Sequence, residues 1–266
     1  MKEITALLVK KLRLQTGAGI VDCKNALVQQ KGNFEKSIDF LRKLGQVNAV
    51  QKQSNITSQG CIFIGRNEKH SAMLELNCET DFVSKEHNFL SFGKDIINYL
   101  IVSGTDDKKL LRKFFEQKRI DLISKLNENI FIRRSVVCNG SNIGSYLHHN
   151  RIGVLVQTKS YCQEKLIKNI AMHIASSKPE YLCPKLIPQS VLNREYNIQL
   201  ELAKKSKKSE FIIEKIVQGK MTKFSNKVSL LGQNFVFDPH KTVGDIILEN
   251  NVEIISFFRF EVGELI

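Results

Sequence analysis

Hydrophobic positions near the amino terminus recur at steps of three and four residues, which is the spacing of one face of a helix. This spacing predicts three short helices in residues 1 to about 45. Gly17 and Gly19 separate the first two helices, and Asn33 is the expected cap of the third. The three apolar stripes are Ile4, Leu7, Leu8 and Leu12, then Val21, Ala26 and Leu27, and finally Phe34, Ile38, Leu41 and Leu44. A polar linker over residues 51–55 is expected to follow them.

Beyond the linker, the pattern predicts a unit of strand, turn and helix that occurs twice. Residues 72–76 suit a strand, and a helix with apolar positions through Leu100 follows them. Residues 152–156 repeat the strand, and a helix carrying Ile170 and Ile174 repeats the second element. The expected partner strands are residues 60–64 and 129–137 for the first unit, and residues 145–146 and 255–262 for the second. We therefore expect an α+β fold with two α/β core subdomains whose strands are antiparallel.

Two further apolar stripes between residues 184 and 226 predict an antiparallel helical hairpin. The stripes are Leu192, Tyr196, Leu200 and Ala203, and Ile213, Val217, Met221 and Phe224, with a charged hinge at residues 204–209. Such a hairpin exposes apolar surface, so a second copy or another protein is expected to cover it. The expected domain boundaries are residues 1–54 for the N-terminal helices, 55–140 for the first subdomain, 141–183 with 227–266 for the second, and 184–226 for the hairpin.

The composition indicates a cytoplasmic protein with reduced thiols. No run of about 18 residues is apolar, and the first five residues lack the charged and apolar segments of a secretion signal. The six cysteines are scattered without a CxxC pair, which argues against a zinc site and against a redox dithiol. We expect them to be structural thiols in a reducing compartment.

The net charge of +13 has two interpretations. A basic surface is usual in proteins that bind nucleic acids, and a sequence pI near 9.4 fits that class. However, the basic residues are spread along the chain, and no stacking motif of the RNA-recognition type occurs. General enrichment of lysine on solvated faces is therefore favoured over a dedicated RNA site, and no specific nucleic acid partner is expected.

The chain lacks the motifs of enzymes that use phosphate loops, serine nucleophiles or zinc. There is no GxxxxGK[ST] sequence, and the glycines of residues 17–19 follow a helix rather than a strand, so they do not cradle a phosphate. No serine lies in a GxSxG elbow. His148 and His149 are adjacent, so in a strand their side chains point to opposite faces. His173, on an apolar helix face, is expected to be a hydrogen-bonded core residue. We expect no enzymatic activity, no metal and no cofactor.

Residues 77–86, Asn-Cys-Glu-Thr-Asp-Phe-Val-Ser-Lys-Glu, lie where the first predicted strand passes into its helix. Two interpretations fit the centre of this turn. In the first, Thr80 or Asp81 caps the helix and Phe82 belongs to the core. In the second, the turn displays the carboxylate and the ring together. The ring then fills a pocket of a partner protein while the acid binds exposed donors.

Several ordered motifs resemble those of the elongation factor Ts family. They are Thr16-Gly17-Ala18-Gly19, Asp22-Cys23-Lys24 with Ala26-Leu27, Thr80-Asp81-Phe82-Val83, Glu128-Asn129-Ile130 with Arg133-Arg134, Arg151 to Val156, Ile170 to Ala175, and Arg259 to Gly263. Together they extend over roughly 260 residues at the family's spacing, whereas each short motif alone is weak evidence. The resemblance implies a UBA-like module at the N-terminus, and it implies that the hairpin is a coiled-coil or dimerisation module.

The resemblance also implies which residues contact a partner GTPase, elongation factor Tu. Phe82 is expected to wedge between helices of the GTPase domain beside its magnesium site, while Asp81 draws on groups near that site. Magnesium and phosphate contacts then loosen and GDP leaves. The implied partner-binding residues are Thr80, Asp81, Phe82 and Val83 in the turn, Leu126 and His148 in the core, and Arg13, Ile20 and Val21 in the N-terminal module. The family often has two methionines at positions 20 and 21, so the branched side chains here are a departure.

By this resemblance the chain is a guanine-nucleotide exchange factor that binds GDP-bound elongation factor Tu during translation elongation. Many relatives continue past Gly263 into a helix that packs on the GTPase, whereas this sequence stops at Ile266, so weaker binding is expected. Two other functions remain as alternatives. One is a basic RNA-binding or ribosome-associated protein that has kept the fold, and the other is a dimerising scaffold.

Overall fold

The computed structural model describes residues 4–205 and 209–265 and divides into two compact units. The first unit holds the chain up to Asn139, the segment His149–Arg151 and the C-terminal residues from Phe260 onward. The second unit holds Gly140–His148 and Ile152–Arg259. Both units combine helices with antiparallel strand pairs, which confirms the predicted α+β class. None of the described helices is long and apolar enough to cross a membrane.

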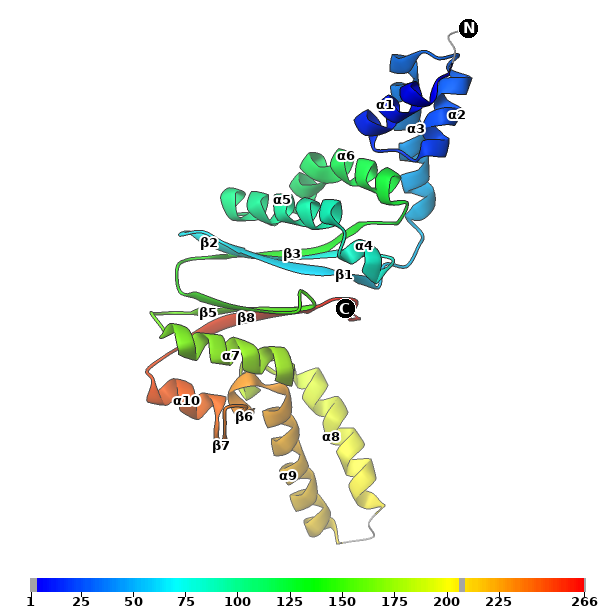
Figure 1. Ribbon diagram of the computed structural model, residues 1–266. Helices are drawn as coiled ribbons and strands as arrows, with labels where there is room; N and C mark the ends of the chain where they lie inside the picture. Colours follow the sequence, from blue (N-terminus) through cyan, green and yellow to red (C-terminus); the bar gives the residue numbers. More distant parts are fainter. Residues whose placement is uncertain (1–3, 206–208, 266) are drawn as a thin grey trace. The chain divides into compact units, whose positions relative to one another are not determined.

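The first unit begins with three helices whose apolar stripes meet in a small bundle (Figure 1). The helices are α1 (Ala6–Thr16), α2 (Ile20–Gln29) and α3 (Phe34–Lys52). Leu12, Leu27 and Leu41, one from each helix, are buried together. Gly17 ends α1 with a φ of 72°, in the left-handed region that favours glycine. Asn33 caps α3 through its side chain, as predicted.

A three-stranded antiparallel sheet forms the core of the first unit, with two helices on one face (Figure 1). Its strands, in spatial order, are β1 (Gln59–Arg66), β2 (His70–Cys78) and β3 (Phe131–Asn139). The helices that follow β2 are α4 (Asp81–Ser84), α5 (His87–Ser103) and α6 (Lys108–Leu126). Leu74, Phe89, Ile96 and Ile123 are buried between the sheet and the helices. Each such side chain contributes roughly 1.5–3 kcal/mol, so this apolar layer is what stabilises the unit.

The third helix is longer than predicted, because its last turns pack on the sheet's own core. Ala49 is buried in the same cluster as Leu74. A Cβ added to Gly45 would lie 2.4 Å from the Ser124 hydroxyl of α6, so the two helices approach closely at this glycine. These contacts explain why α3 continues to Lys52 rather than ending near residue 45.

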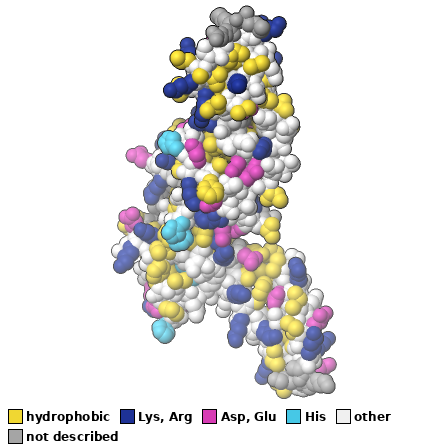
Figure 2. Space-filling view, turned by 45° about the vertical axis from the view of Figure 1, so that its right-hand side comes forward, with side chains coloured by type: hydrophobic (Ala, Val, Ile, Leu, Met, Phe, Trp, Pro, Cys, Tyr) yellow, Lys and Arg dark blue, Asp and Glu magenta, His cyan; other side chains and the backbone are white. Residues whose placement is uncertain are grey.

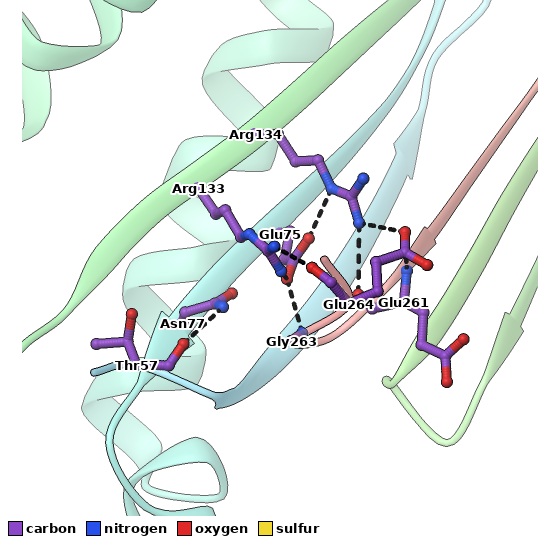
Figure 3. Close-up of polar contacts among 8 residues, drawn as sticks. All are labelled: Thr57, Glu75, Asn77, Arg133, Arg134, Glu261, Gly263 and Glu264. Carbon is purple, nitrogen blue, oxygen red and sulfur yellow. Dashed lines mark hydrogen bonds and ion pairs between the residues drawn. The ribbon is translucent and has the colours of Figure 1, made fainter. Parts of the chain in front are cut away.

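A buried carboxylate joins the C-terminal residues to the sheet of the first unit (Figure 3). Glu75 on β2 is fully buried, and it accepts hydrogen bonds from Arg133 at 2.8 Å and from Arg134 at 2.7 Å. The Gly263 N–H donates to the same carboxylate at 3.1 Å. A buried charge is tolerated only when it is paired and fully hydrogen-bonded, and these three donors meet that requirement.

Arg134 holds the C-terminal segment by three further contacts, of which one is a hydrogen bond to the Glu261 carbonyl at 3.4 Å. Its guanidinium lies 4.1 Å from the centre of the Phe260 ring, and it pairs with the Glu264 carboxylate at 2.6 Å. Contacts of this kind group the residues from Phe260 onward with the first unit, whereas the sequence-based boundaries placed residues 227–266 together in the second subdomain.

The second unit has its own three-stranded sheet, in which β5 (Ile152–Thr158) lies between β4 (Ile143–His148) and β8 (Ile254–Glu261). The helix α7 (Glu164–Ser177) packs along this sheet (Figure 1). Val154, Val156, Ile170 and Ile174 form the centre of the core. The smaller elements are β6 (Asn234–Phe235), β7 (Asp238–Thr242) and α10 (Val243–Glu249). The repeat of strand, turn and helix is thus present in both units.

A helical hairpin within the second unit is formed by α8 (Gln189–Lys204) and α9 (Glu210–Val228) (Figure 1). Short 3-10 turns, η1 (Pro184–Leu186) and η2 (Leu230–Gly232), lie at its two ends. Ala203, Ile213 and Val217 are buried between the helices. Other apolar side chains of the two helices are exposed, namely Tyr196, Ile198, Leu202, Phe211 and Ile212. On the face seen in Figure 2, apolar side chains of the hairpin lie among lysines and arginines. Residues 206–208 of the predicted hinge lie outside the described residues.

Candidate partner-binding site

The motif from Thr80 to Val83 forms the turn between β2 and α5, as the sequence indicated. Thr80 has an extended backbone, and its side chain accepts a hydrogen bond from the Val83 N–H at 3.4 Å. This is the geometry of a helix N-cap, and Asp81 is the first residue of α4 rather than its cap. The cap fixes where the backbone turns, and so it fixes the direction of the side chain two residues later.

Glu128 holds the same turn from the other side. It follows α6, and its Oε2 accepts from the N–H groups of Glu79 at 3.2 Å and Thr80 at 3.0 Å. Its Oε1 accepts from the Thr80 hydroxyl at 2.6 Å. Charge-assisted hydrogen bonds are about twice as strong as neutral ones, so three of them fix this backbone firmly.

Glu79 connects the turn to the segment that precedes β1. Its Oε1 accepts from the Asn129 N–H at 2.6 Å and from the Asn55 side chain at 2.9 Å. The Asn129 side chain in turn donates to the backbone carbonyl of Asn55 at 3.1 Å. The base of the turn is therefore a polar network contributed by three separate segments of the first unit.

Phe82 is displayed on this fixed turn. Its side chain is 82% exposed, whereas Val83 and Ser84 beside it are buried. The interpretation in which Phe82 belongs to the core is therefore wrong, because α4 buries its other face against the sheet. A large aromatic ring that is exposed to this degree gains no stability from burial in the isolated chain, so its exposure indicates a contact with another molecule.

Asp81 precedes Phe82 in the chain, and its carboxylate is exposed to solvent. The Lys85 ammonium donates to its Oδ2 at 2.8 Å, and both side chains are exposed. This hydrogen bond, together with the positive charge of Lys85, lowers the pKa of Asp81 below its ordinary value. Exposed ion pairs of this kind contribute little stability, so a partner can compete for the Asp81 carboxylate at small cost.

The two core-subdomain residues that are expected to contact the GTPase, Leu126 and His148, lie in different units. Leu126 is the last residue of α6 and packs partly buried against the core of the first unit, two residues before Glu128. His148 is the last residue of β4 in the second unit, and its Nδ1 lies 3.0 Å from the Tyr146 hydroxyl. His149 follows in the turn with a positive φ of 48°.

The three predicted residues of the N-terminal module are all on its surface. Ile20 and Val21 open α2 and are 56% and 69% exposed. Arg13 is exposed in the last turn of α1. Only residues 17–19 separate the end of α1 from the start of α2. Arg13 and the pair Ile20 and Val21 therefore belong to the same small helical bundle.

The remaining histidine of interest is structural. His173 on α7 is buried, and its Nε2 lies 2.9 Å from the Gln233 side-chain oxygen. Its Nδ1 accepts from the Val236 N–H at 3.3 Å. Burial lowers the pKa of His173, so the neutral imidazole is the favoured form. Among the described residues, no three histidine, cysteine or acidic side chains gather where they would hold a metal ion.

Glu128, Glu79 and Lys85 all contact the turn from Thr80 to Val83 or the residues beside it, but the sequence pattern predicts no role for them. Glu128 stands out in the sequence only as part of the motif Glu128-Asn129-Ile130. A carboxylate that follows a helix end and lies about 50 residues from its hydrogen-bond partners leaves no periodic signal, so only the fold shows the contact.

Comparison with known proteins gives a consistent result. The model of the family described as Elongation factor TS matches residues 79–264. Elongation factor Ts of Buchnera aphidicola subsp. Baizongia pistaciae is 53% identical over 264 residues, which cover 99% of both chains. Elongation factor Ts of Photorhabdus laumondii subsp. laumondii is 48% identical over 266 residues, covering 99% of this chain and 94% of that protein. The Yersinia pestis (strain Pestoides F) protein of the same name is 48% identical, with 99% and 93% covered. This chain belongs to the elongation factor Ts family.

Proposed function

We propose that the protein is a guanine-nucleotide exchange factor that binds GDP-bound elongation factor Tu and promotes release of GDP, so that GTP binds during translation elongation. The observation that carries this proposal is the exposure of Phe82, at 82%, on a turn fixed by Thr80 and Glu128. A rigidly mounted, exposed aromatic ring is the usual anchor of a protein interface, because little entropy is lost when it enters a pocket.

In this mechanism the ring of Phe82 enters between helices of the GTPase domain beside the magnesium site. The Asp81 carboxylate exchanges its exposed ion pair with Lys85 for groups near that site. Magnesium and phosphate contacts in the GTPase then loosen, and GDP dissociates. Linkage requires that GDP weaken the binding of the exchange factor by the same factor by which the exchange factor weakens GDP.

No covalent chemistry is needed for this activity, so the protein is proposed to act without a catalytic residue or a cofactor of its own. Its function depends on differential binding to two states of the GTPase. Translation elongation takes place in the cytoplasm, and we propose that location for the protein.

The other proposed contacts supply affinity. Ile20 and Val21 offer a small exposed apolar surface, with Arg13 at the end of the neighbouring helix. Leu126 and His148 are proposed to contact the GTPase from the two core subdomains. The exposed apolar side chains of α8 and α9 support a further proposal, that the hairpin associates with a second copy of the chain.

The experiment that tests the function mixes this protein with elongation factor Tu loaded with fluorescent GDP. An excess of unlabelled nucleotide is added and the release rate is followed. We expect the rate to rise with the concentration of this protein and to saturate. A release rate that does not depend on the concentration of this protein contradicts the proposal.

A further inference from the structure

A pocket of about 870 Å³ in the first unit is separate from the proposed GTPase site. It is lined by residues of α6 from Lys108 to Arg119, by the start of β3 and by the segment of residues 53–57 that precedes β1. The turn from Thr80 to Val83 does not line it. A volume of this order is within the range of pockets that hold a molecule the size of a nucleotide.

The pocket is strongly basic. Seven of its lining residues are cationic: Lys108, Lys109, Arg112, Lys113, Arg119, Arg133 and Arg134. Three of these are already paired, since Arg119 bonds Glu116 and the two arginines of β3 bond Glu75. The other four occupy the first two turns of α6, and in the described part of the chain none of them forms an ion pair with a carboxylate.

Among the described residues that line the pocket, Glu116 is the one carboxylate, and its hydrogen-bonded partner is Arg119 rather than any of those four cations, although the charge of Arg112 also acts on it. Its oxygens accept from Arg119 at 2.7 and 3.0 Å. This bidentate bond lowers the pKa of Glu116, so the Glu116 carboxylate stays ionised and its negative charge is paired with Arg119. A concentration of unpaired positive charge in a hollow surface attracts anions, and phosphate groups above all.

The same pocket contains an exposed aromatic ring. Phe131, the first residue of β3, lines it and is 46% exposed, and Ile56, which also lines it, is 85% exposed. The pocket thus combines a partly exposed ring with four cations that form no ion pair with a described carboxylate, and these match the two parts of a nucleotide, since a base stacks on the ring and the phosphates bind the cations. An acidic peptide would satisfy the cations but leave the ring without a stacking partner.

We propose that this pocket binds single-stranded RNA, with phosphates on the four cations of α6 and a base stacked on Phe131. Recognition is through backbone charge and stacking, so it is independent of sequence and sensitive to salt. The four cations are close together in the sequence, at residues 108–113, but only the fold shows that Phe131 lines the same pocket.

The experiment measures binding of a fluorescein-labelled oligouridine to the full chain by anisotropy, over a series of salt concentrations. The pocket variant carries Lys108→Gln, Lys109→Gln, Arg112→Gln and Lys113→Gln. Glutamine is a good helix former, so α6 is retained. The matched control carries glutamine in place of four exposed lysines of α7 and α9, namely Lys165, Lys168, Lys220 and Lys223. Thermal melting is recorded for each variant.

We expect the pocket variant to lose at least about tenfold in affinity at low salt, while the control changes much less. The slope of log K against log salt should become less negative by about 3, because each phosphate of a single strand that a cation neutralises contributes roughly 0.7 through counterion release, and the variant lacks four such cations. Phe131→Ala should cost about tenfold. Tyr161→Ala, which removes an exposed ring of the second unit that does not line the pocket, should have little effect.

Three results overturn the proposal. The first is an equal loss of affinity in the pocket and control variants, which would assign RNA binding to the general charge. The second is that the parent binds uridine diphosphate but not the oligouridine, and that the pocket variant no longer binds uridine diphosphate. The third is tighter binding of polyglutamate than of RNA by the parent, with the loss confined to the pocket variant. Since elongation factor Tu is absent from this assay, its outcome is independent of the proposed exchange activity.

Discussion

The Glu128 carboxylate accepts both the N–H and the hydroxyl of Thr80, at 3.0 and 2.6 Å, and so fixes the residue that caps α4. The consequence reaches Phe82, because the direction of an exposed ring depends on the backbone that bears it. Glu128 is thereby a positioning residue: it lies under the turn and is proposed to act only through the ring.

Replacing Glu128 tests this positioning role. Glu128→Ala removes three accepted hydrogen bonds, and we expect GDP release from elongation factor Tu to slow by roughly tenfold, since a bond to a charged group contributes about 1.5–3 kcal/mol. Glu128→Gln keeps one acceptor oxygen and should be intermediate. Glu253→Ala, which breaks only the exposed ion pair with Lys159, is the matched control. Full exchange activity in Glu128→Ala would show that the turn does not need this support.

The N-terminal module should contribute affinity more than exchange. Deleting residues 1–52 is a poor test, because it also removes Ala49 from the core of the first unit. The double variant Ile20→Ser, Val21→Ser removes exposed apolar groups only. We expect weaker binding to elongation factor Tu and an unchanged release rate at saturation, with Val28→Ser on the same helix as control. Normal binding with a reduced maximal rate would contradict this division.

The hairpin should be separable from the rest of the second unit. Ala203, Ile213 and Val217 are buried among the hairpin's own residues, in a cluster distinct from that of the sheet. Replacing residues 184–226 with a glycine and serine linker should therefore leave cooperative melting of the remaining fold. Loss of secondary structure throughout the shortened chain, measured by circular dichroism, would show that the hairpin belongs to the core.

His173 should make the stability of the second unit depend on pH. Its Nδ1 accepts from the Val236 N–H, and a protonated ring would face that donor with another donor. Burial lowers the pKa of His173 in the folded state, so the unfolded chain binds more protons below its ordinary value near 6.5. Stability is thus complete above that value and is lost as the pH falls. His173→Gln does not titrate, and its melting should depend less on pH between about 5 and 7.5. Equal pH dependence in the parent and the variant would exclude His173 as the cause.

The repeat of strand, turn and helix was predictable, because its apolar positions have a clear period. Residues 72–76 and 152–156 lie in strands, and the helices after them bury Ile96 and Ile170 as the spacing indicated. The hairpin was likewise visible as two stripes. These elements are determined by local sequence, since each buries one face against an immediate neighbour.

Other features depend on contacts between distant residues. The helix α6 was not predicted, although its buried positions, Leu111, Phe115, Leu122 and Ile123, have helical spacing. What depends on the fold is their packing in the core that includes Leu74. The link from Glu75 to Gly263 joins residues 188 positions apart, and no periodicity marks it. Exposure of Phe82 was one of two open interpretations, since an aromatic residue at a turn fits the core as well as the surface.

The most direct test of the account is Phe82→Ala, examined for both GDP release and thermal melting. Because the ring is 82% exposed, its removal should leave the melting temperature nearly unchanged. As an interface anchor it should cost about 2 kcal/mol or more of the interaction with elongation factor Tu, and GDP release should slow by roughly thirtyfold. Phe237→Ala, at a ring that is 49% exposed in the second unit, is the matched control. If Phe82→Ala melts normally and still accelerates GDP release in full, the proposed wedge is wrong.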